Sequence, residues 1–171
     1  MSSDDAGLAR RCERFLFDEA ELLDDGEFER WLGLFTQDAV YWLPVDTSRR
    51  EPRGGLNIIY DDRSRLEDRV RRLRSGYSHT EMPPSKTSHL IANLRIIDSE
   101  DDRGSWLPPD PSHVLVVGRM IVAQSRRERT NTFHARVVWT LLRSGAQLAI
   151  RGKRIDLLDA DGPLPALTFL L

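Results

Sequence analysis

The segment that most constrains this chain covers residues 60–93, where a charge-dense helix is followed by a Pro-Pro turn and a strand. The spacing predicts a helix over 61–74, with Leu66, Val70 and Leu73 as a narrow apolar stripe. Acidic residues stand at its start and arginines at its end, which is the order that the helix dipole favours. So many charges in ordered structure need partners, either inside the fold or on another subunit.

The chain before this segment is predicted to begin with two helices. Apolar residues over 8–23 follow helical spacing, and Gly26 is a plausible stop signal. A short second helix would place on one face the side chains of Phe28, Trp31, Leu32 and Phe35. The polar triplet 36–38 is expected to be a turn, and 39–45, rich in Val, Tyr and Trp, is expected to be a strand.

The second half of the chain has the composition of long strands. Strands are predicted over 87–97, 113–124, 130–142 and 147–158. The first of these would present one face made of Leu90, Ala92, Leu94 and Ile96. The connections are too short for helical crossovers and therefore favour antiparallel pairing. We expect an α+β fold in which N-terminal helices pack on a strongly curved, mostly antiparallel sheet, as a single domain over 1–171.

The composition excludes several classes of protein. A formal net charge of -2 creates no general attraction to nucleic acid or an anionic membrane. Cys12 is the one cysteine, so neither an intrachain disulfide nor a thiolate-cluster metal site can form, and its helical position predicts a core thiol. The N-terminal stretch has no apolar signal core and no run is long enough to span a membrane, so we expect a cytoplasmic protein.

Four residues could carry acid–base chemistry in a pocket enclosed by such a cone. They are Asp38, Tyr41, His89 and His113. Structural interpretations compete with this one: Asp38 could fix a turn through its side chain, Tyr41 could belong to the core, and His89 could cap the sheet edge. The four histidines are widely spaced, so a 2-His-1-carboxylate iron site would have to assemble in space.

Several motifs occur in a distinctive order. The helix contains Arg69-Val70-Arg71-Arg72-Leu73, and the turn and strand read Pro83-Pro84-Ser85-Lys86-Thr87-Ser88-His89-Leu90, followed by Asn93. In this order they resemble the small (beta) subunit of aromatic-ring-hydroxylating dioxygenases. Segments 15–24, 38–45, 154–158 and 164–171 are also similar, and the likeness is weakest over 99–145. Segment 77–82 departs from the family pattern, because it lacks the tryptophan and acid-proline often found there.

The resemblance implies a cone-shaped fold of the nuclear-transport-factor-2 type and a non-catalytic, structural role in aromatic compound catabolism. It implies assembly with a large (alpha) oxygenase subunit, three of each, with self-association as a trimer. The Rieske 2Fe-2S cluster and the mononuclear iron would belong to that partner, with no cofactor or metal in this chain. Subunit contacts would involve Asp61, Asp62, Arg63, Arg69, Arg72, Pro83, Pro84, Ser85 and His89. The alternative is a stand-alone cone-fold dehydratase, isomerase or cyclase with an apolar pocket.

Overall fold

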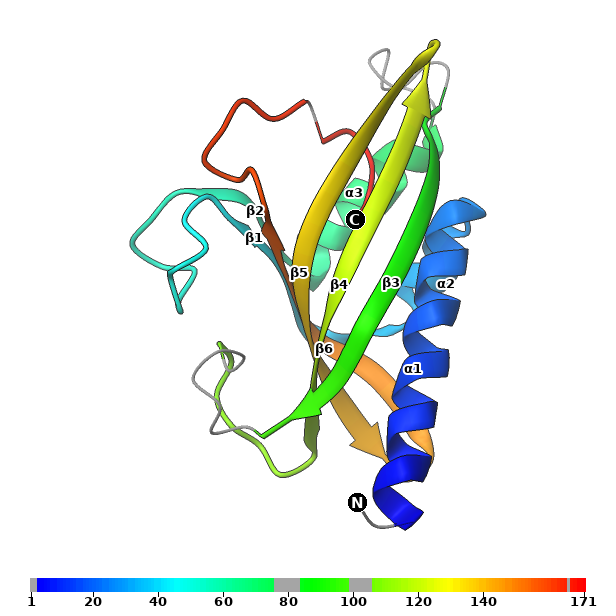
Figure 1. The fold of residues 1–171 in the computed structure, drawn as a ribbon, viewed down its shortest axis with the longest axis vertical. Helices are drawn as coiled ribbons and strands as arrows, with labels where there is room; N and C mark the ends of the chain where they lie inside the picture. The colour runs from blue at the N-terminus through cyan, green and yellow to red at the C-terminus, as the bar shows by residue number, and fades with distance from the viewer. Residues whose placement is uncertain (1–2, 76–83, 99–105, 166) are drawn as a thin grey trace.

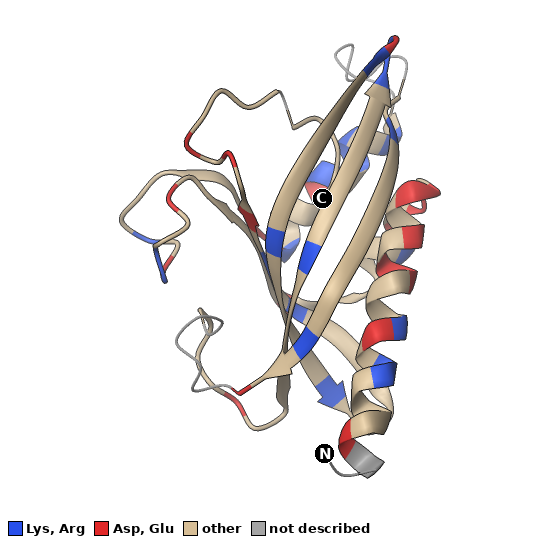
Figure 2. Ribbon diagram, viewed as in Figure 1, with Lys and Arg blue, Asp and Glu red and all other residues tan. Residues whose placement is uncertain are grey.

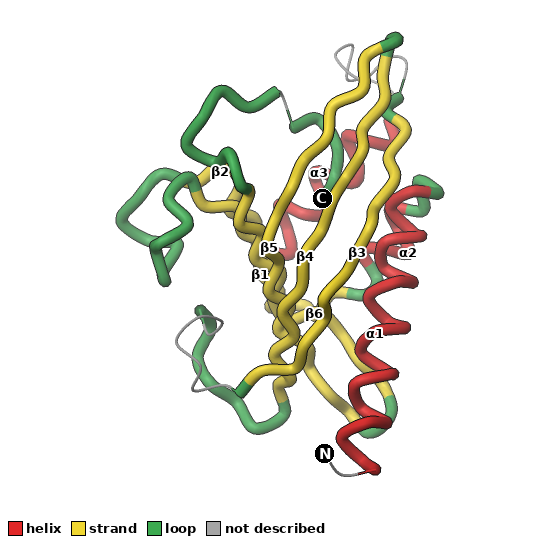
Figure 3. Tube along the Cα trace, in the orientation of Figure 1, coloured by secondary structure: helices red, strands yellow, loops and turns green. Residues whose placement is uncertain are grey.

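A computed structural model describes residues 3–75, 84–98, 106–165 and 167–171 (Figure 1). Its elements are α1 (Ser3–Asp24), α2 (Phe28–Leu32), β1 (Phe35–Pro44), β2 (Asn57–Asp62), α3 (Arg63–Ser75), β3 (Lys86–Ile97), β4 (His113–Arg126), β5 (Arg129–Ser144) and β6 (Gln147–Leu157). The strands form one twisted sheet in the order β2-β1-β6-β5-β4-β3, with the helices on one side of it (Figure 3). Its neighbouring strands are antiparallel except for β1 and β6, so the predicted α+β architecture is confirmed.

α1 is the helix predicted over 8–23, and its apolar stripe packs into the core. Cys12, Leu16 and Leu23 are at most 3% exposed. The helix ends before Gly26, whose φ of 71° is a left-handed conformation that glycine adopts without steric cost. α1 packs against β3, the edge strand of the sheet, and so covers an edge that would otherwise be open to pairing with another chain.

The prediction for the stretch after α2 is wrong in two respects. The helix ends at Leu32, and Phe35 opens β1 instead of belonging to the helix. The triplet 36–38, predicted as a turn, lies inside β1. Its polar composition is typical of turns, but the parallel partner β6 pairs with β1 on both sides of it, and the register between the strands shifts between Phe35 and Val40.

β2 has no counterpart in the predictions, and it displaces the start of the charged helix. Asp61 and Asp62 were expected to begin that helix, but they pair with Tyr41 and Val40 as the last residues of β2. α3 starts at Arg63. Asp62 nevertheless caps the helix, because its Oδ1 accepts a hydrogen bond from the backbone N–H of Arg65 at 3.0 Å.

β3 contains a bulge that divides the face predicted for it. Asn93 has a φ of 56°, and the register with β4 shifts between Ala92 and Arg95. Leu90 lies on the outer face of the sheet and is 65% exposed, whereas Leu94, beyond the bulge, packs on the inner core. The expectation that these residues share one face is therefore wrong, because strict alternation fails at an inserted residue.

The sheet carries an apolar cluster on each face. The larger one lies between the sheet and the helices, and includes Leu16, Trp31 and Trp139. The smaller one lies on the outer face, where Trp106 and neighbouring loop residues cover Trp42, Leu115 and Val138. Gly152 permits this contact, because a Cβ there would lie 2.8 Å from the Trp106 ring.

The C-terminal residues turn back between the sheet and α3, where the chain terminus lies in Figure 1. Phe169, Leu170 and Leu171 are at most 6% exposed, and the Phe169 ring packs on Phe133 with centroids 5.2 Å apart. The space beneath the curved sheet is thus occupied by the chain itself. Within the described ranges, no helix combines the length and the apolar character needed to cross a membrane.

Candidate functional site

A buried charge cluster lies between α1 and the sheet. Glu19, on α1, is 0% exposed and receives three hydrogen bonds. Lys153 Nζ of β6 donates to Oε1 at 2.6 Å, Trp31 Nε1 donates to Oε1 at 3.1 Å, and Trp139 Nε1 of β5 donates to Oε2 at 3.0 Å. Both carboxylate oxygens are therefore satisfied without water.

This cluster ties together elements that are distant in sequence. Burial lowers the pKa of the Lys153 ammonium, and the Glu19 carboxylate acts against that shift. Removing one member would leave a buried charge unpaired, which is far more costly than losing an exposed ion pair. Sequence analysis missed the cluster, although a signal was present: Glu19 falls within the apolar helical stripe of 8–23, a position that calls for a buried partner.

Tyr41, a candidate acid–base residue, is bonded to the C-terminal segment. Its hydroxyl donates to the carbonyl oxygen of Leu171 at 2.8 Å and accepts from the backbone N–H of Leu171 at 3.1 Å. Burial strongly raises the pKa of the phenol. Tyr41 is thus a core residue, as one of the two interpretations held, and its hydroxyl anchors irregular backbone that needs hydrogen bonds inside the fold.

His89 is held by Asp24, the last residue of α1. The Asp24 carboxylate accepts from His89 N at 2.8 Å, from Thr87 Oγ1 at 2.9 Å, and lies 2.5 Å from His89 Nδ1. Burial alone would raise the pKa of Asp24, but hydrogen bonds from His89 and Thr87 outweigh it and lower that pKa. One carboxylate therefore clamps the start of the edge strand to α1. His89 Nε2 is buried, and among the described residues it has no hydrogen-bond partner.

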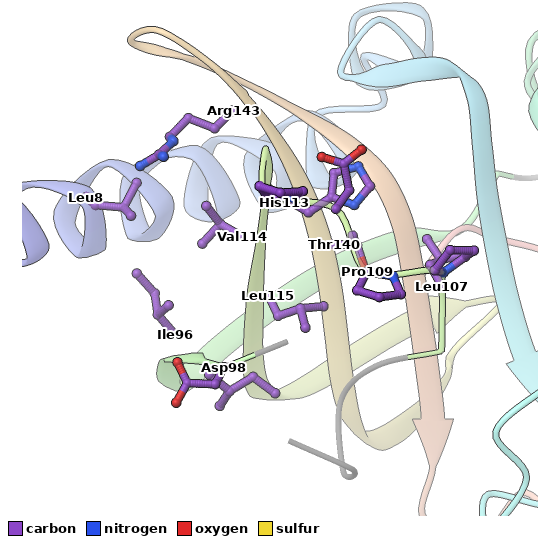
Figure 4. Close-up of a pocket in the computed structure, with 14 residues that line it drawn as sticks. Leu8, Ile96, Asp98, Leu107, Pro109, His113, Val114, Leu115, Thr140 and Arg143 are labelled. Carbon is purple, nitrogen blue, oxygen red and sulfur yellow. The ribbon is translucent and has the colours of Figure 1, made fainter. Parts of the chain in front are cut away.

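Asp38 and His113 lie in different surroundings. The Asp38 side chain is 69% exposed and pairs with Arg151 Nε at 2.8 Å, while Thr36 Oγ1 donates to it at 2.8 Å. His113 begins β4 and lines a cavity of about 300 Å³ together with Leu8, Thr140 and other residues (Figure 4). His89 faces Val122 on β4, nine residues along the strand from His113, or about 30 Å at the usual rise per residue.

The structure therefore does not bring the four candidate acid–base residues together. Tyr41, His89 and Asp38 each have their own partners, and a shared substrate could not reach two histidines at opposite ends of a strand. Cys12 is equally remote from chemistry, because burial raises the pKa of its thiol despite the nearby Arg11 and Arg143. Across the described ranges, no three His, Cys, Asp or Glu side chains gather closely enough to hold a metal ion.

Part of the predicted contact surface around α3 is engaged within the chain. Asp61 is 7% exposed, and its Oδ2 lies 2.6 Å from Arg69 Nη2. Arg63 donates through Nη1 to the carbonyl oxygens of Leu32 and Phe35, each at 2.8 Å. These charges hold α3 against β2 and against the connection from α2 to β1.

Among the other predicted contact residues, Asp62, Arg72 and Pro84 lie at the surface. Arg72 is exposed beside an open groove of about 450 Å³, which is also lined by Asp61, Arg65, Asp68 and Arg71. Pro84 is exposed, and Ser85 Oγ accepts a hydrogen bond from Gln124 Nε2 at 2.8 Å. Pro83 lies outside the described residues. Arg72 and Pro84 are thus available to a partner in a way that Asp61 and Arg63 are not.

Comparisons with known proteins point to one family. A family model described as "ring hydroxylating beta subunit" matches residues 18–161. The small oxygenase component of the p-cumate 2,3-dioxygenase system from Pseudomonas putida is 31% identical over 175 residues, covering 99% of this chain and 92% of that protein. Toluate 1,2-dioxygenase subunit beta from Pseudomonas putida is 38% identical over 92 residues, and there this chain spans only 57% of the relative's length.

A solved structure has the same fold. The beta subunit of benzoate 1,2-dioxygenase from Burkholderia mallei superposes with a TM-score of 0.70 at 25% identity, covering 93% of this chain and 95% of that one. The likeness therefore covers nearly the whole chain.

Proposed function

Because this chain belongs to the family of ring-hydroxylating beta subunits, we propose that it is the non-catalytic, structural small subunit of a multicomponent ring-hydroxylating dioxygenase. The observation that carries the proposal is the match to a small oxygenase component along 99% of the chain. Residues 1–171 act in it as one domain, in the cytoplasm, within a pathway of aromatic compound breakdown.

The partner in this proposal is a large oxygenase subunit, with three copies of each chain and a trimer of this one. That subunit would carry a Rieske 2Fe-2S cluster and a mononuclear iron. A Rieske centre needs two cysteines and two histidines, and this chain has a single cysteine, so its residues do not fit that cluster. The redox chemistry is accordingly assigned to the partner.

The contacts described above support a scaffolding role for the charged residues. Asp61, Asp62, Arg63 and Arg69 shape α3 through bonds within the chain, and they present the exposed Arg72. Pro84 and Ser85 directly precede β3, and Asp24 clamps His89 near the start of that strand. We propose that the partner contacts Arg72 and Pro84 directly. The predicted contact residues that bond within the chain, such as Asp61 and His89, would position these two.

The alternative of a stand-alone dehydratase, isomerase or cyclase is not favoured. Such an enzyme needs an acid and a base facing one cavity. Here the Tyr41 hydroxyl is occupied by Leu171, and Asp38 forms a surface ion pair with Arg151.

The test is co-expression with a cognate large subunit, followed by purification through a tag on this chain. We expect an iron-containing complex that hydroxylates at least one aromatic carboxylate of the kind named for the relatives, such as toluate, p-cumate or benzoate. The large subunit without this chain should be unstable or poorly assembled. Failure to associate with any Rieske-type subunit would refute the proposal, as would turnover by the isolated chain without an iron protein.

A further inference from the structure

The outer face of β3, β4 and β5 carries a row of arginines. Arg95, Arg119 and Arg136 come from these three strands in turn, and none of the three strands contains an acidic residue (Figure 2). The row ends at β6, where Asp156 stands opposite Arg136. Arg119 stands directly opposite Arg136 in the β4–β5 register. Like charges placed directly opposite each other destabilise a sheet, so this arrangement has a cost in the isolated chain.

Compensation within the chain is incomplete. Arg136 Nη1 lies 3.5 Å from Asp156 Oδ2, but Asp156 also binds Arg154 at 2.7 Å. Arg95 and Arg119 are exposed, and neither forms an ion pair with any residue in the described parts of the chain. Sites where a protein keeps an unfavourable local arrangement are commonly functional.

Exposed apolar side chains flank the arginine row. Leu90 on β3 pairs across the strands with Ile121 on β4, and the two are 65% and 38% exposed. No helix covers this face in Figure 1. A partner for it should therefore combine carboxylates with an apolar side chain.

The same chain has a surface of that description on α1. Asp18 and Glu21 are exposed on α1, and Asp25, also exposed, directly follows the helix. Their i, i+3, i+7 spacing places them along one stripe, because the Asp25 N–H still donates to the Glu21 carbonyl oxygen at 2.9 Å. Phe17, beside them, is 42% exposed. In the described parts of the chain none of the three acids has an ion-pair partner, and acidic residues concentrate in this half of α1 (Figure 2).

The two surfaces also match in spacing. Side chains three or four positions apart on a helix are about 5–6 Å apart. Neighbouring strands of a sheet are about 4.8 Å apart, which is nearly the interval between the directly opposite Arg119 and Arg136. Arg95 is opposite Val117, so it lies diagonally from Arg119, at about 7–8 Å. A helix laid across the strands could bring its acids opposite successive arginines, with Phe17 against Leu90 and Ile121.

We propose that the α1 stripe of one copy, Asp18-Glu21-Asp25 with Phe17, docks on the arginine row of a second copy. The contact joins two different surfaces of the chain, so repetition produces a closed ring when the rotation between copies closes. The inference rests on the proposed role as an assembling subunit and specifies the surfaces through which its copies meet.

Sedimentation of the isolated chain over a range of concentrations tests this contact. We expect self-association that weakens with added salt, because the ion pairs are partly screened. Arg119→Glu and Glu21→Arg should each weaken association at least tenfold, or about 1.4 kcal/mol. The double variant Arg119→Glu/Glu21→Arg restores opposite charges across the contact and should recover most of the association.

Arg10→Glu is the matched control, since it reverses an exposed charge on α1 outside the stripe. It should leave association nearly unchanged. Arg119→Glu relieves the repulsion from Arg136 and should fold normally, which thermal melting will verify. A monomeric wild-type chain at all concentrations, or two single variants that associate normally, would overturn the inference.

Binding of the large subunit, measured separately by co-purification, distinguishes this inference from the proposed function. If Arg119→Glu abolishes large-subunit binding but leaves self-association intact, the arginine row belongs to the large subunit and the inference is wrong. If the large subunit binds the wild-type chain while no self-association occurs, the proposed function stands and only the docking of copies fails.

Discussion

Lys153 Nζ lies 2.6 Å from Glu19 Oε1, in an ion pair whose two side chains are 1% and 0% exposed. The residues are 134 positions apart in sequence, so the pair joins the first helix to the last strand of the sheet. Trp31 and Trp139 complete the hydrogen bonding of the carboxylate.

Glu19→Gln should strongly destabilise the chain. It leaves the Lys153 ammonium buried without a counter-charge, a change that typically costs roughly 3–5 kcal/mol. Urea unfolding measures the loss. Glu13→Gln, at an exposed position of the same helix, should change the free energy of unfolding only slightly. The double variant Glu19→Gln/Lys153→Met removes both charges and should recover part of the stability; no recovery would mean that the packing of Glu19 matters more than its charge.

Asp24→Asn should abolish one contribution to acid sensitivity. The pKa of Asp24 is lowered in the folded chain, so its ionised form contributes stability above its ordinary pKa of 3.8, and this is lost as the pH falls through the folded pKa. Free energies of unfolding for wild type and variant should differ at neutral pH and converge in acid. Glu27→Gln, at an exposed position nearby, supplies the comparison. If the difference between the two free energies of unfolding stayed constant down to strongly acidic pH, Asp24 would not be the source of this acid sensitivity.

Tyr41→Phe should loosen the C-terminal segment while leaving the sheet intact. The variant removes a hydroxyl that makes two hydrogen bonds with Leu171, and an unsatisfied buried backbone group costs about 1–3 kcal/mol. Amide hydrogen exchange at Leu171 should accelerate more than exchange in β5. Tyr60→Phe, at a residue that is 38% exposed, serves as the control. Unchanged exchange at Leu171 would show that apolar packing alone retains the segment.

Arg72→Glu should weaken assembly with the large subunit and spare the fold. Arg72 is exposed beside the groove next to α3, so its reversal places repulsion at the proposed contact without breaking an internal pair. We expect at least a tenfold loss of affinity in co-purification or titration, about 1.4 kcal/mol. Arg10→Glu, an exposed charge reversal on α1, is the control and should leave this affinity nearly unchanged.

Arg69→Glu provides the contrast to Arg72→Glu. It breaks the pair with the buried Asp61 and should therefore lower the melting temperature of the isolated chain. Any loss of assembly in this variant would follow from that loss of stability. If Arg72→Glu assembles normally, α3 is a solvated surface and the contact lies elsewhere.

The sequence predicted a helix or strand correctly where the whole element keeps one pattern of buried and exposed residues. α1 and the strand over 130–142 were recognisable because their apolar residues recur with a single period, and the strand over 113–124 because its apolar residues lie on both faces. The errors fall where two elements meet within a few residues. Asp61 and Asp62 are the last residues of β2, and Asp62 also caps α3. In β3, the bulge at Asn93 changes which residues face the core.

The remaining features depend on contacts between residues that are distant in sequence. Sequence alone established the class of fold, the lack of cysteines for a thiolate-cluster metal site and the resemblance to oxygenase small subunits, because composition, periodicity and motif order are properties of the linear chain. Only the folded structure showed that Tyr41 binds Leu171, that His89 binds Asp24 and that Glu19 meets Lys153. Each of these pairs joins residues more than 60 positions apart, and no local pattern specifies which distant polar groups burial will bring together.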